Sequence, residues 1–372
     1  MFTPTASFYE TDVTFPVPLL DARTWCLEIA GLVQRPLTLQ FDELVDAGVE
    51  EFDATLVCVH NPVGGPRIGT ARWLGVPASR LLEQAGVLDD ADQLLAPAVD
   101  GFTAGVPLAT LRDHRAFVVV GVNGELLPPD HGHPARLLVP GLYGYDANTK
   151  WLTKLELTRF RDVADYWTRR GWPADPAHVR PGARIDTPKP RVSVLSGRAT
   201  VAGVPWAPPT GVRAVDLSID DGPWQPTVLT RALHSDAWRQ WRIDVDLAPG
   251  AHALAARPRT SDDVVSPRVE PPYPNGRRVC TASRSMRSEL RISRCGRCER
   301  WWPSRANACS LLATASEHGV AAALGMHGVR DPDRGSRGSC ALHGEQSRYF
   351  SKMPTTPSRP RPSINWRVCD AR

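Results

Sequence analysis

The sequence predicts an α+β domain, then a β-sandwich, then a tail without regular structure, and three observations support this order. Short strand patterns alternate irregularly with short helix patterns up to about residue 172, unlike the regular βαβ alternation of a doubly wound sheet. Strand patterns alone continue from residue 191 to residue 257. From residue 277 onward no strand or helix periodicity persists. We therefore place domains at 1–175 and 191–276, a linker at 176–190 and a tail at 277–372.

The elements of the first domain follow from local patterns of apolar residues and turn residues. They are a half-buried strand at 25–31, a short helix that begins at 41–45 with acidic residues in its first turn, a helix at 79–86 that ends at a glycine, a buried strand at 117–120 and a turn at 123–124. Their irregular order favours an α+β fold.

The second domain is predicted from recurring strand patterns alone. They lie at 191–195, 212–219, 238–247 and 252–257, with a hairpin turn at 220–223. Several short strands at this spacing favour an immunoglobulin-like β-sandwich. No strand pattern directly follows the Pro-Asn-Gly of 274–276, so we expect the last strand of the sandwich to be missing.

The tail differs from the rest of the chain in charge and in cysteine content. It holds 18 basic and 7 acidic side chains, a net charge of +11, which leaves −7 for the first 276 residues. Its low hydrophobicity and high charge predict disorder. The abrupt change in composition favours the hypothesis that the reading frame shifts near Gly276. Cys295 and Cys298 form a Cys-x-x-Cys pair, but we do not favour zinc because no folded framework surrounds them.

Composition also excludes several classes of protein. The acidic body offers no basic face for nucleic acid. No run of about 20 apolar residues is present, so we expect no transmembrane segment. Only Cys26 and Cys58 lie outside the tail, which argues against a disulfide framework. The first residues have neither a basic nor an apolar leader, so the chain as written carries no export signal and is expected to be cytoplasmic.

Cys58 is the first candidate for chemistry. It ends the apolar run of residues 55–57 and opens a turn that contains Gly64 and Gly65. A thiolate on a rigid strand end suits a soft metal, and a glycine pair lets backbone approach a bound group. On its own, this position is more typical of a small buried hydrophobe than of a metal ligand.

Residues 131–151 form the second candidate segment, with cationic groups around a glycine-rich backbone. The guanidinium of Arg136 suits bidentate contact with phosphate, and Lys150 supplies a point charge. Amides near Gly141 and Gly144 can form an anion-binding concavity. The alternative is a solvated surface loop, for which so many glycines and aromatic residues are unusual. The segment therefore predicts a site for an anionic cofactor.

Several motifs occur in the order found in sulfite oxidase-like molybdenum enzymes, and the chain resembles that family over residues 8–172. These motifs are Phe8-Tyr9, Cys58 in its Cys-Val-x-Asn-x-Val-Gly-Gly setting, and residues 99–103, 123–128 and 131–151. The later runs at 206–208, 221–224 and 238–241 resemble the molybdenum-cofactor oxidoreductase dimerisation domain of the same family. The order of several motifs is more specific than any one of them.

The resemblance implies a cofactor and the residues that hold it. The cofactor is Mo-molybdopterin, a mononuclear molybdenum bound by one pyranopterin dithiolene, and Cys58 is implied as both metal ligand and catalytic residue. The implied cofactor contacts are Tyr9, Glu10, Asp100, His131, Arg136, Asn148, Thr149 and Lys150. The implied reaction is two-electron oxygen-atom transfer, in which the metal does the redox chemistry and the protein supplies positioning and electrostatics.

The chain departs from the family pattern where substrate would bind. Sulfite-oxidising members place arginines just after the cysteine and a tyrosine before the Asn-Gly turn. Here residues 60–62 are His, Asn and Pro, and Val120 stands in place of the tyrosine. A desolvated dianion then lacks its main stabilising partner, unless Arg67 or Arg72 turns toward it. We therefore expect another oxyanion, an S-oxide or an N-oxide rather than sulfite.

Three further expectations concern partners, His60 and an alternative function. No haem-attachment motif is present, so we expect a separate electron-transfer partner, together with a homodimer formed through the sandwich. Relatives are commonly exported or attached to a membrane segment, which leaves localisation open.

His60 is either a proton donor in the pocket or a hydrogen-bonded structural histidine. The alternative function is a non-catalytic or damaged copy of such an enzyme, acting at most as a β-sandwich interaction module.

Overall fold

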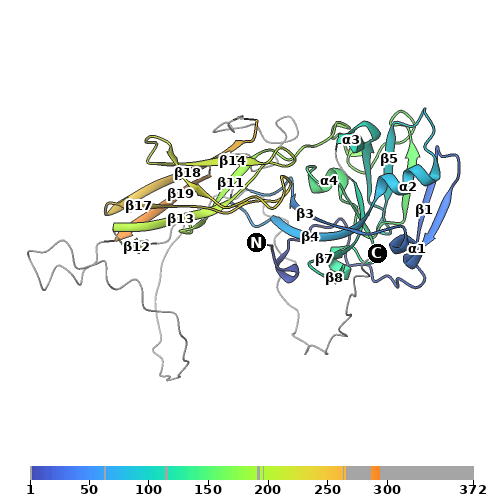
Figure 1. Cartoon of the computed structure of the whole chain (residues 1–372), viewed down its shortest axis with the longest axis horizontal. Helices are drawn as coiled ribbons and strands as arrows, with labels where there is room; N and C mark the ends of the chain where they lie inside the picture. Colours follow the sequence, from blue (N-terminus) through green and yellow to red (C-terminus); the bar gives the residue numbers. More distant parts are fainter. Residues whose placement is uncertain are drawn as a thin grey trace, which may run out of the picture. The chain divides into compact units, whose positions relative to one another are not determined.

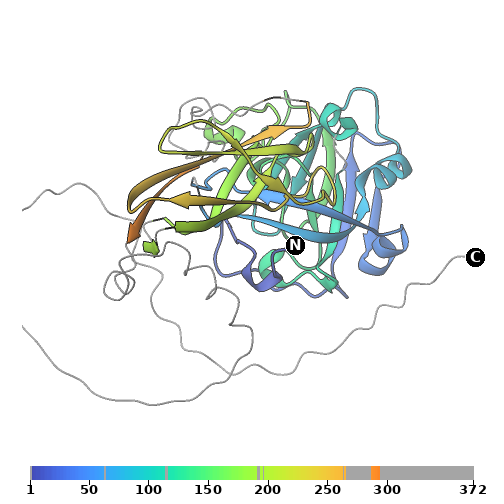
Figure 2. The ribbon, with the colours of Figure 1, turned by 60° about the vertical axis from the view of Figure 1, so that its left-hand side comes forward.

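The computed structural model describes residues 2–62, 64–113, 116–190, 193–195, 197–262, 264 and 286–293. Over these residues the chain is built mostly of β-strands, which form four sheets, and its helices are short (Figures 1 and 2). None of the described helices has the length and apolar character needed to cross a bilayer. The α+β prediction for the N-terminal part is confirmed in this coarse sense.

The first sheet of the N-terminal part joins strands from both ends of that part. Its order is β2 (Leu37–Gln40), β1 (Cys26–Gly31), β10 (Lys154–Thr158), β5 (Gln93–Pro97) and β6 (Thr103–Pro107). Alternate residues of β1, such as Leu27 and Ile29, are fully buried, which confirms the predicted half-buried strand. β1 pairs in parallel with β10, so segments more than 120 residues apart along the chain lie side by side.

The second sheet carries the segment that leads to Cys58. Its order is β3 (Glu50–Val57), β4 (Ile68–Pro77), β7 (Phe117–Val122) and β8 (Glu125–Leu126), with β9 (Arg136–Leu138) paired to β7. Every residue of β7 is buried, as predicted. Asn123 and Gly124 have φ values of 51° and 82°, the left-handed conformations that a two-residue hairpin turn requires.

Short helices fill the space around these sheets. They are α1 (Phe41–Asp46), α2 (Ala78–Ala85), α3 (Leu108–Asp113) and α4 (Gly144–Ala147), with 3-10 turns η1 (Thr5–Ser7), η2 (Pro129–His131) and η3 (Thr168–Arg170). α1 begins at a capping box of Gln40 and Glu43, and α2 ends at Gly86, which has a φ of 70°. Both helix predictions are confirmed.

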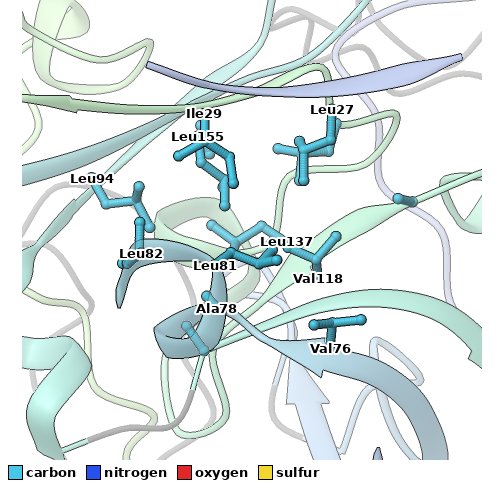
Figure 3. Packing of buried hydrophobic residues seen from close by; sticks show 14 of the residues in the cluster. Leu27, Ile29, Val76, Ala78, Leu81, Leu82, Leu94, Val118, Leu137 and Leu155 are labelled. Atoms are coloured by element: carbon cyan, nitrogen blue, oxygen red, sulfur yellow. The ribbon is translucent and has the colours of Figure 1, made fainter. Parts of the chain in front are cut away.

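One hydrophobic core joins the two sheets of the N-terminal part. Figure 3 shows Leu27, Ile29 and Leu155 of the first sheet, Val76, Val118 and Leu137 of the second, and Leu81 and Leu82 of α2 between them. Since deletion of a buried leucine side chain costs about 2–5 kcal/mol, this core holds the two sheets in one arrangement.

The second part consists of two sheets packed around a separate core. One sheet has the order β11 (Gly182–Thr187), β13 (Gly197–Trp206), β17 (Trp241–Leu247) and β16 (Val228–Leu229). The other has the order β12 (Ser193–Leu195), β19 (Met286–Ser293), β18 (Gly250–Thr260), β14 (Val212–Ile219) and β15 (Gln225–Pro226). Their common core includes Val201, Leu217, Trp241 and Leu254. We call this part the sandwich; its immunoglobulin-like character stays a prediction.

Two predictions about the edges of the sandwich are wrong. The predicted linker at 176–190 contains β11, which pairs with β13 where Gly203 leaves room for the strand: a Cβ there would lie 1.8 Å from the carbonyl oxygen of Arg184. The linker-like composition of 176–190 thus hides a strand, whose close approach depends on a glycine of the neighbouring strand. The last strand is also present, because β19 pairs antiparallel with β18 and parallel with β12.

β19 lies inside the predicted tail, where its sequence alternates apolar Leu290 and Ile292 with arginines. Such alternation over a short run is a strand pattern, which the high charge of the surrounding tail obscures. The predicted disorder and frameshift for the rest of 277–372, and the Cys295–Cys298 pair, concern residues outside the described ones.

Candidate functional site

Cys58 lies directly after β3, at the start of a tight loop that returns the chain to β4. Its backbone N–H donates to the carbonyl of Arg67 (3.0 Å), and its carbonyl accepts from the N–H of Asn61 (2.9 Å). The side chain is 7% exposed and lines a cavity of about 250 Å³. A backbone held at both groups fixes where the thiol points, as a metal ligand requires.

The loop after Cys58 is locked by one buried side chain. Asn61 is 1% exposed, and its Oδ1 accepts from the backbone N–H of Arg67 (2.9 Å). A Cβ on Gly65 would lie 2.6 Å from that Oδ1. Gly65 is therefore required by the internal packing of the loop, whereas the sequence pattern assigned the glycine pair to the approach of a bound group.

An N-terminal segment forms one wall of the cavity. Its start is fixed by the N–H of Thr3, which donates to the carbonyl of Thr70 (2.7 Å). Phe8 packs edge-on against Trp73 with ring centroids 5.5 Å apart. Tyr9 is half-buried near Cys58, and its pKa is raised, first by loss of hydration and then by the cysteine. Tyr9 therefore stays protonated and can donate a hydrogen bond into the cavity.

Two cationic side chains, Arg136 and Lys150, form a further part of the wall, which we call the cationic wall. Arg136, on β9, is 7% exposed, and its Nη1 donates to the carbonyl of His131 (3.3 Å). Burial lowers the pKa of Arg136 to about 10, so it remains charged at neutral pH. The Nζ of Lys150 donates to the carbonyl of Asp130 (2.7 Å) and forms an ion pair with Asp12. Two partly dehydrated cations thus face the same space.

Unpaired polar atoms test whether these residues fit the predicted cofactor. Nε of Arg136, both amide atoms of Asn148 and Oγ1 of Thr149 are buried and have no hydrogen-bond partner within the described residues. Buried polar groups in native proteins are nearly always paired. Of these residues, Arg136 and Asn148 line the cavity. A bound anionic, polar group could accept from Nε of Arg136 and from the amide nitrogen of Asn148 and could donate to the amide oxygen of Asn148, so both residues fit the phosphate and pterin of the predicted cofactor.

Seven of the nine predicted site residues line this one cavity. They are Tyr9, Cys58, Asp100, His131, Arg136, Asn148 and Lys150. Two do not line it: Thr149 is fully buried behind the wall, and Glu10 is exposed. The carboxylate of Glu10 lies within 4.8 Å of ligand atoms of Asp130 and His131, at the outer edge of the wall. The structure thus joins segments that are more than 90 residues apart.

Sequence reasoning missed several wall residues, and the signals for them differ. Thr11 and Asp12 directly follow the predicted pair Tyr9-Glu10, and Thr11 Oγ1 lies 3.9 Å from Cys58 Sγ. Adjacency along the chain could have found both. Trp167 carried no such signal, because η3 brings it to the cavity only through the tertiary fold.

An aromatic wall borders the cavity beside the Cys58 loop. Tyr145 and Trp167 line the cavity, and Trp172 packs against Tyr145 with ring centroids 4.7 Å apart. His60 also lines it, with its ring centroid 6.5 Å from that of Trp172. No hydrogen bond joins the imidazole to another described residue, so the structural reading of His60 has no support. Burial and the charge of Arg67 lower the pKa of His60.

Neither arginine proposed to compensate for the loop lies in the cavity wall. Arg72 is turned to Asp53, with its Nε 2.9 Å from Oδ1. Arg67 is exposed and acts on His60 only through its charge. Val120 is likewise not a wall residue: it is 1% exposed in the core between the sheets. The comparison of Val120 with a substrate-facing tyrosine is therefore wrong, because strand alternation turns this position away from the cavity.

Comparisons with known proteins agree with this geometry. Residues 14–167 match the family model described as oxidoreductase molybdopterin binding domain. The mitochondrial sulfite oxidase of Homo sapiens is 30% identical over 310 residues, which cover 70% of this chain and 56% of that protein. The NADH nitrate reductase of Solanum lycopersicum is 29% identical over 192 residues, which cover 44% of this chain and 21% of that protein. This chain spans about half the length of the sulfite oxidases that it matches.

A solved structure shares the fold. The sulfane dehydrogenase SoxCD from Paracoccus pantotrophus superposes with a TM-score of 0.63 over 74% of this chain and 80% of that chain. The two sequences are 21% identical over the match, so the likeness shows the fold alone.

Proposed function

The chain belongs to the sulfite oxidase-like family of molybdopterin-binding oxidoreductases, and from this membership we propose that it catalyses two-electron oxygen-atom transfer at a molybdenum ligated by Cys58. One observation carries the proposal: Cys58 lines the same cavity as Arg136, Asn148 and Lys150. A soft thiolate and a set of anion-binding groups in one small space match the two ends of Mo-molybdopterin.

The cofactor of this family is Mo-molybdopterin, and we assign its contacts by charge. Arg136 and Lys150 would neutralise the phosphate, while Asn148 and Tyr9 would hydrogen-bond polar atoms of the pterin. Cys58 would supply the protein thiolate. When bound, the group supplies the two-electron redox chemistry and the metal at which oxygen is transferred.

The aromatic wall supports a substrate other than sulfite. Tyr145 and Trp167 line the cavity with aromatic rings beside the Cys58 loop, and no guanidinium from that loop lines it. A dianion would lose hydration there without gaining a charged partner, whereas a small S-oxide or N-oxide would lose much less. Reduction of an S-oxide to a sulfide consumes two electrons and two protons and releases one water. His60, which lines the cavity, would be available to hydrogen-bond the departing oxygen.

A substrate panel tests this specificity. The cofactor-loaded enzyme is assayed for oxidation of sulfite with an artificial electron acceptor. It is also assayed for reduction of a dialkyl sulfoxide and of an amine N-oxide, with reduced viologen as the electron donor. We expect kcat/KM for an S-oxide or N-oxide to exceed that for sulfite by about 100-fold, roughly the 2.7 kcal/mol that one missing charged hydrogen bond costs a dianion. Sulfite as the best substrate would refute the argument from the aromatic wall.

The alternative is a non-catalytic copy, to which the change in composition at residue 277 points. Metal analysis of protein purified from cells with ample molybdate and pterin distinguishes the molybdenum enzyme from the non-catalytic copy. We expect about one molybdenum per chain, since none of the residues that we assign to the cofactor lies in the tail. Protein that folds but holds no molybdenum under these conditions would favour the non-catalytic copy.

Two further proposals concern partners. Electrons would come from or go to a separate protein, since the printed sequence contains no Cys-x-x-Cys-His haem-attachment motif. The sandwich would mediate a homodimer. Co-elution with a redox protein and the mass in solution, measured by light scattering, are the respective checks.

A further inference from the structure

The strand segment that carries Cys58 is packed against the sandwich. Val57 and Val59 flank Cys58, and both are 1% exposed. They share a small hydrophobic cluster with Trp206, the last residue of β13, which belongs to the sandwich. The apolar neighbours of the proposed ligand are thus buried partly by the second part of the chain.

Two hydrogen bonds tie the same strand to a loop of the sandwich. The backbone N–H of Thr55 donates to the carbonyl of Asp236 (2.9 Å), and the N–H of Trp238 donates to Oγ1 of Thr55 (2.8 Å). Thr55 precedes Cys58 by three residues on β3. The sandwich therefore occupies the otherwise open edge of β3.

Arg184 makes the third link, to the far end of the Cys58 loop. It lies on β11, and its Nη1 donates to the carbonyl of Gly65 (3.2 Å). Its Nε donates to Oδ1 of Asp186 (2.7 Å), and its guanidinium lies 5.6 Å from the ring centroid of Trp238. The side chain is only 16% exposed. One planar group is thus oriented by two sandwich residues and binds a backbone carbonyl of the loop.

We propose that Arg184 is a positioning residue, which holds the Cys58 loop in the shape that presents the thiol to the cavity. It does not line the cavity, so it acts through Gly65 and Asn61 rather than on a ligand. Its importance for catalysis rests on the proposed function, but its effect on the thiol does not. The sandwich then builds part of the site in addition to any role in dimerisation.

An arginine suits this role because its fork reaches two partners in fixed directions. A lysine has a single charged atom and cannot bond Asp186 and Gly65 with the same rigid geometry. Arg184→Gln removes the charge and the fork, and Asp186→Asn keeps the arginine but weakens its orientation. Arg198→Gln is the matched control: Arg198 is on β13 in the same sandwich, 76% exposed and paired with Asp244.

The test measures how fast iodoacetamide alkylates Cys58 in cofactor-free full-length protein, with each cysteine quantified by peptide mass spectrometry. We expect Arg184→Gln to speed alkylation of Cys58 about tenfold, because loss of a charged hydrogen bond of about 1.4 kcal/mol raises the open fraction of the loop by that factor. Asp186→Asn and Arg184→Lys should give intermediate rates, and Arg198→Gln the wild-type rate.

Cys26 serves as an internal reference in every sample. It lies on β1, away from the sandwich, so general loosening of the fold would speed both cysteines, whereas a positioning role changes Cys58 alone. If Arg184→Gln fails to fold, the alkylation rate of Cys58 in Asp186→Asn tests the proposal instead. The proposal would be overturned if Cys58 is alkylated at the wild-type rate in the folded variants, or if the rate at Cys26 changes by the same factor. If wild-type protein from molybdate- and pterin-replete cells holds no molybdenum while Arg184→Gln still shows the selective change, the proposed function is refuted and this inference stands.

Discussion

Replacement of Cys58 by serine is expected to abolish turnover while leaving most of the pterin bound. The serine hydroxyl is hard and remains protonated at neutral pH, so it does not replace a thiolate on a soft metal. The cationic wall formed by Arg136 and Lys150 is untouched, and it provides most of the charge attraction for the cofactor. The measurements are turnover with the best substrate, pterin fluorescence after oxidation, and the thiolate-to-molybdenum absorption band, which should disappear.

Cys26→Ser is the matched control for this substitution. Cys26 is also a free cysteine of the N-terminal part, and it pairs with Gln40 at the start of β1 rather than facing the cavity. It should leave turnover and the absorption band unchanged. Turnover by Cys58→Ser at the wild-type rate would contradict the assignment of the ligand, and loss of pterin together with the metal would show that Cys58 holds the whole cofactor.

The sequence predicted those features that depend on neighbours along the chain. β1 alternates in burial, and α2 ends where Gly86 takes a left-handed conformation, because these outcomes depend on a few adjacent residues. The motif segments around Cys58 and Arg136 meet in one cavity, as the resemblance implied. Such predictions hold when a local pattern and the tertiary fold agree.

Thr11, Asp12 and β19 carried local signals that could have revealed them, but other features that escaped prediction depend on contacts between distant segments. β11 was hidden because the prolines and glycine in and around it indicated a linker, although Gly203 on the partner strand leaves room for it. Trp167 reaches the cavity only after η3 is folded against the first sheet, and Val120 faces the core rather than the substrate. Arg184 lies about 120 residues from the loop that it binds. No local period carries such information.

The cationic wall has a cost in stability, which Arg136→Met should reveal. Arg136 is buried, its Nε has no partner within the described residues, and its pKa is lowered to about 10 by burial. The charge therefore destabilises the fold, and a methionine of similar length fills the space without it. We expect the cofactor-free variant to gain about 2–3 kcal/mol in its free energy of unfolding at pH 8, measured with urea. Binding of the cofactor should weaken about 100-fold, since a charged donor to phosphate is lost.

The pH dependence separates this explanation from simple repacking. Because the pKa of Arg136 is lower in the folded protein than in the unfolded one, the cost of its charge is fully present below pH 10 and falls as pH rises above it. The stability difference between Arg136→Met and wild type should therefore be constant from pH 6 to 9 and shrink above pH 10. Arg72→Met, at an exposed ion pair with Asp53, should change neither stability nor cofactor retention by a comparable amount. A less stable Arg136→Met protein that keeps its pterin would mean that Arg136 is structural, and the phosphate would then depend on Lys150.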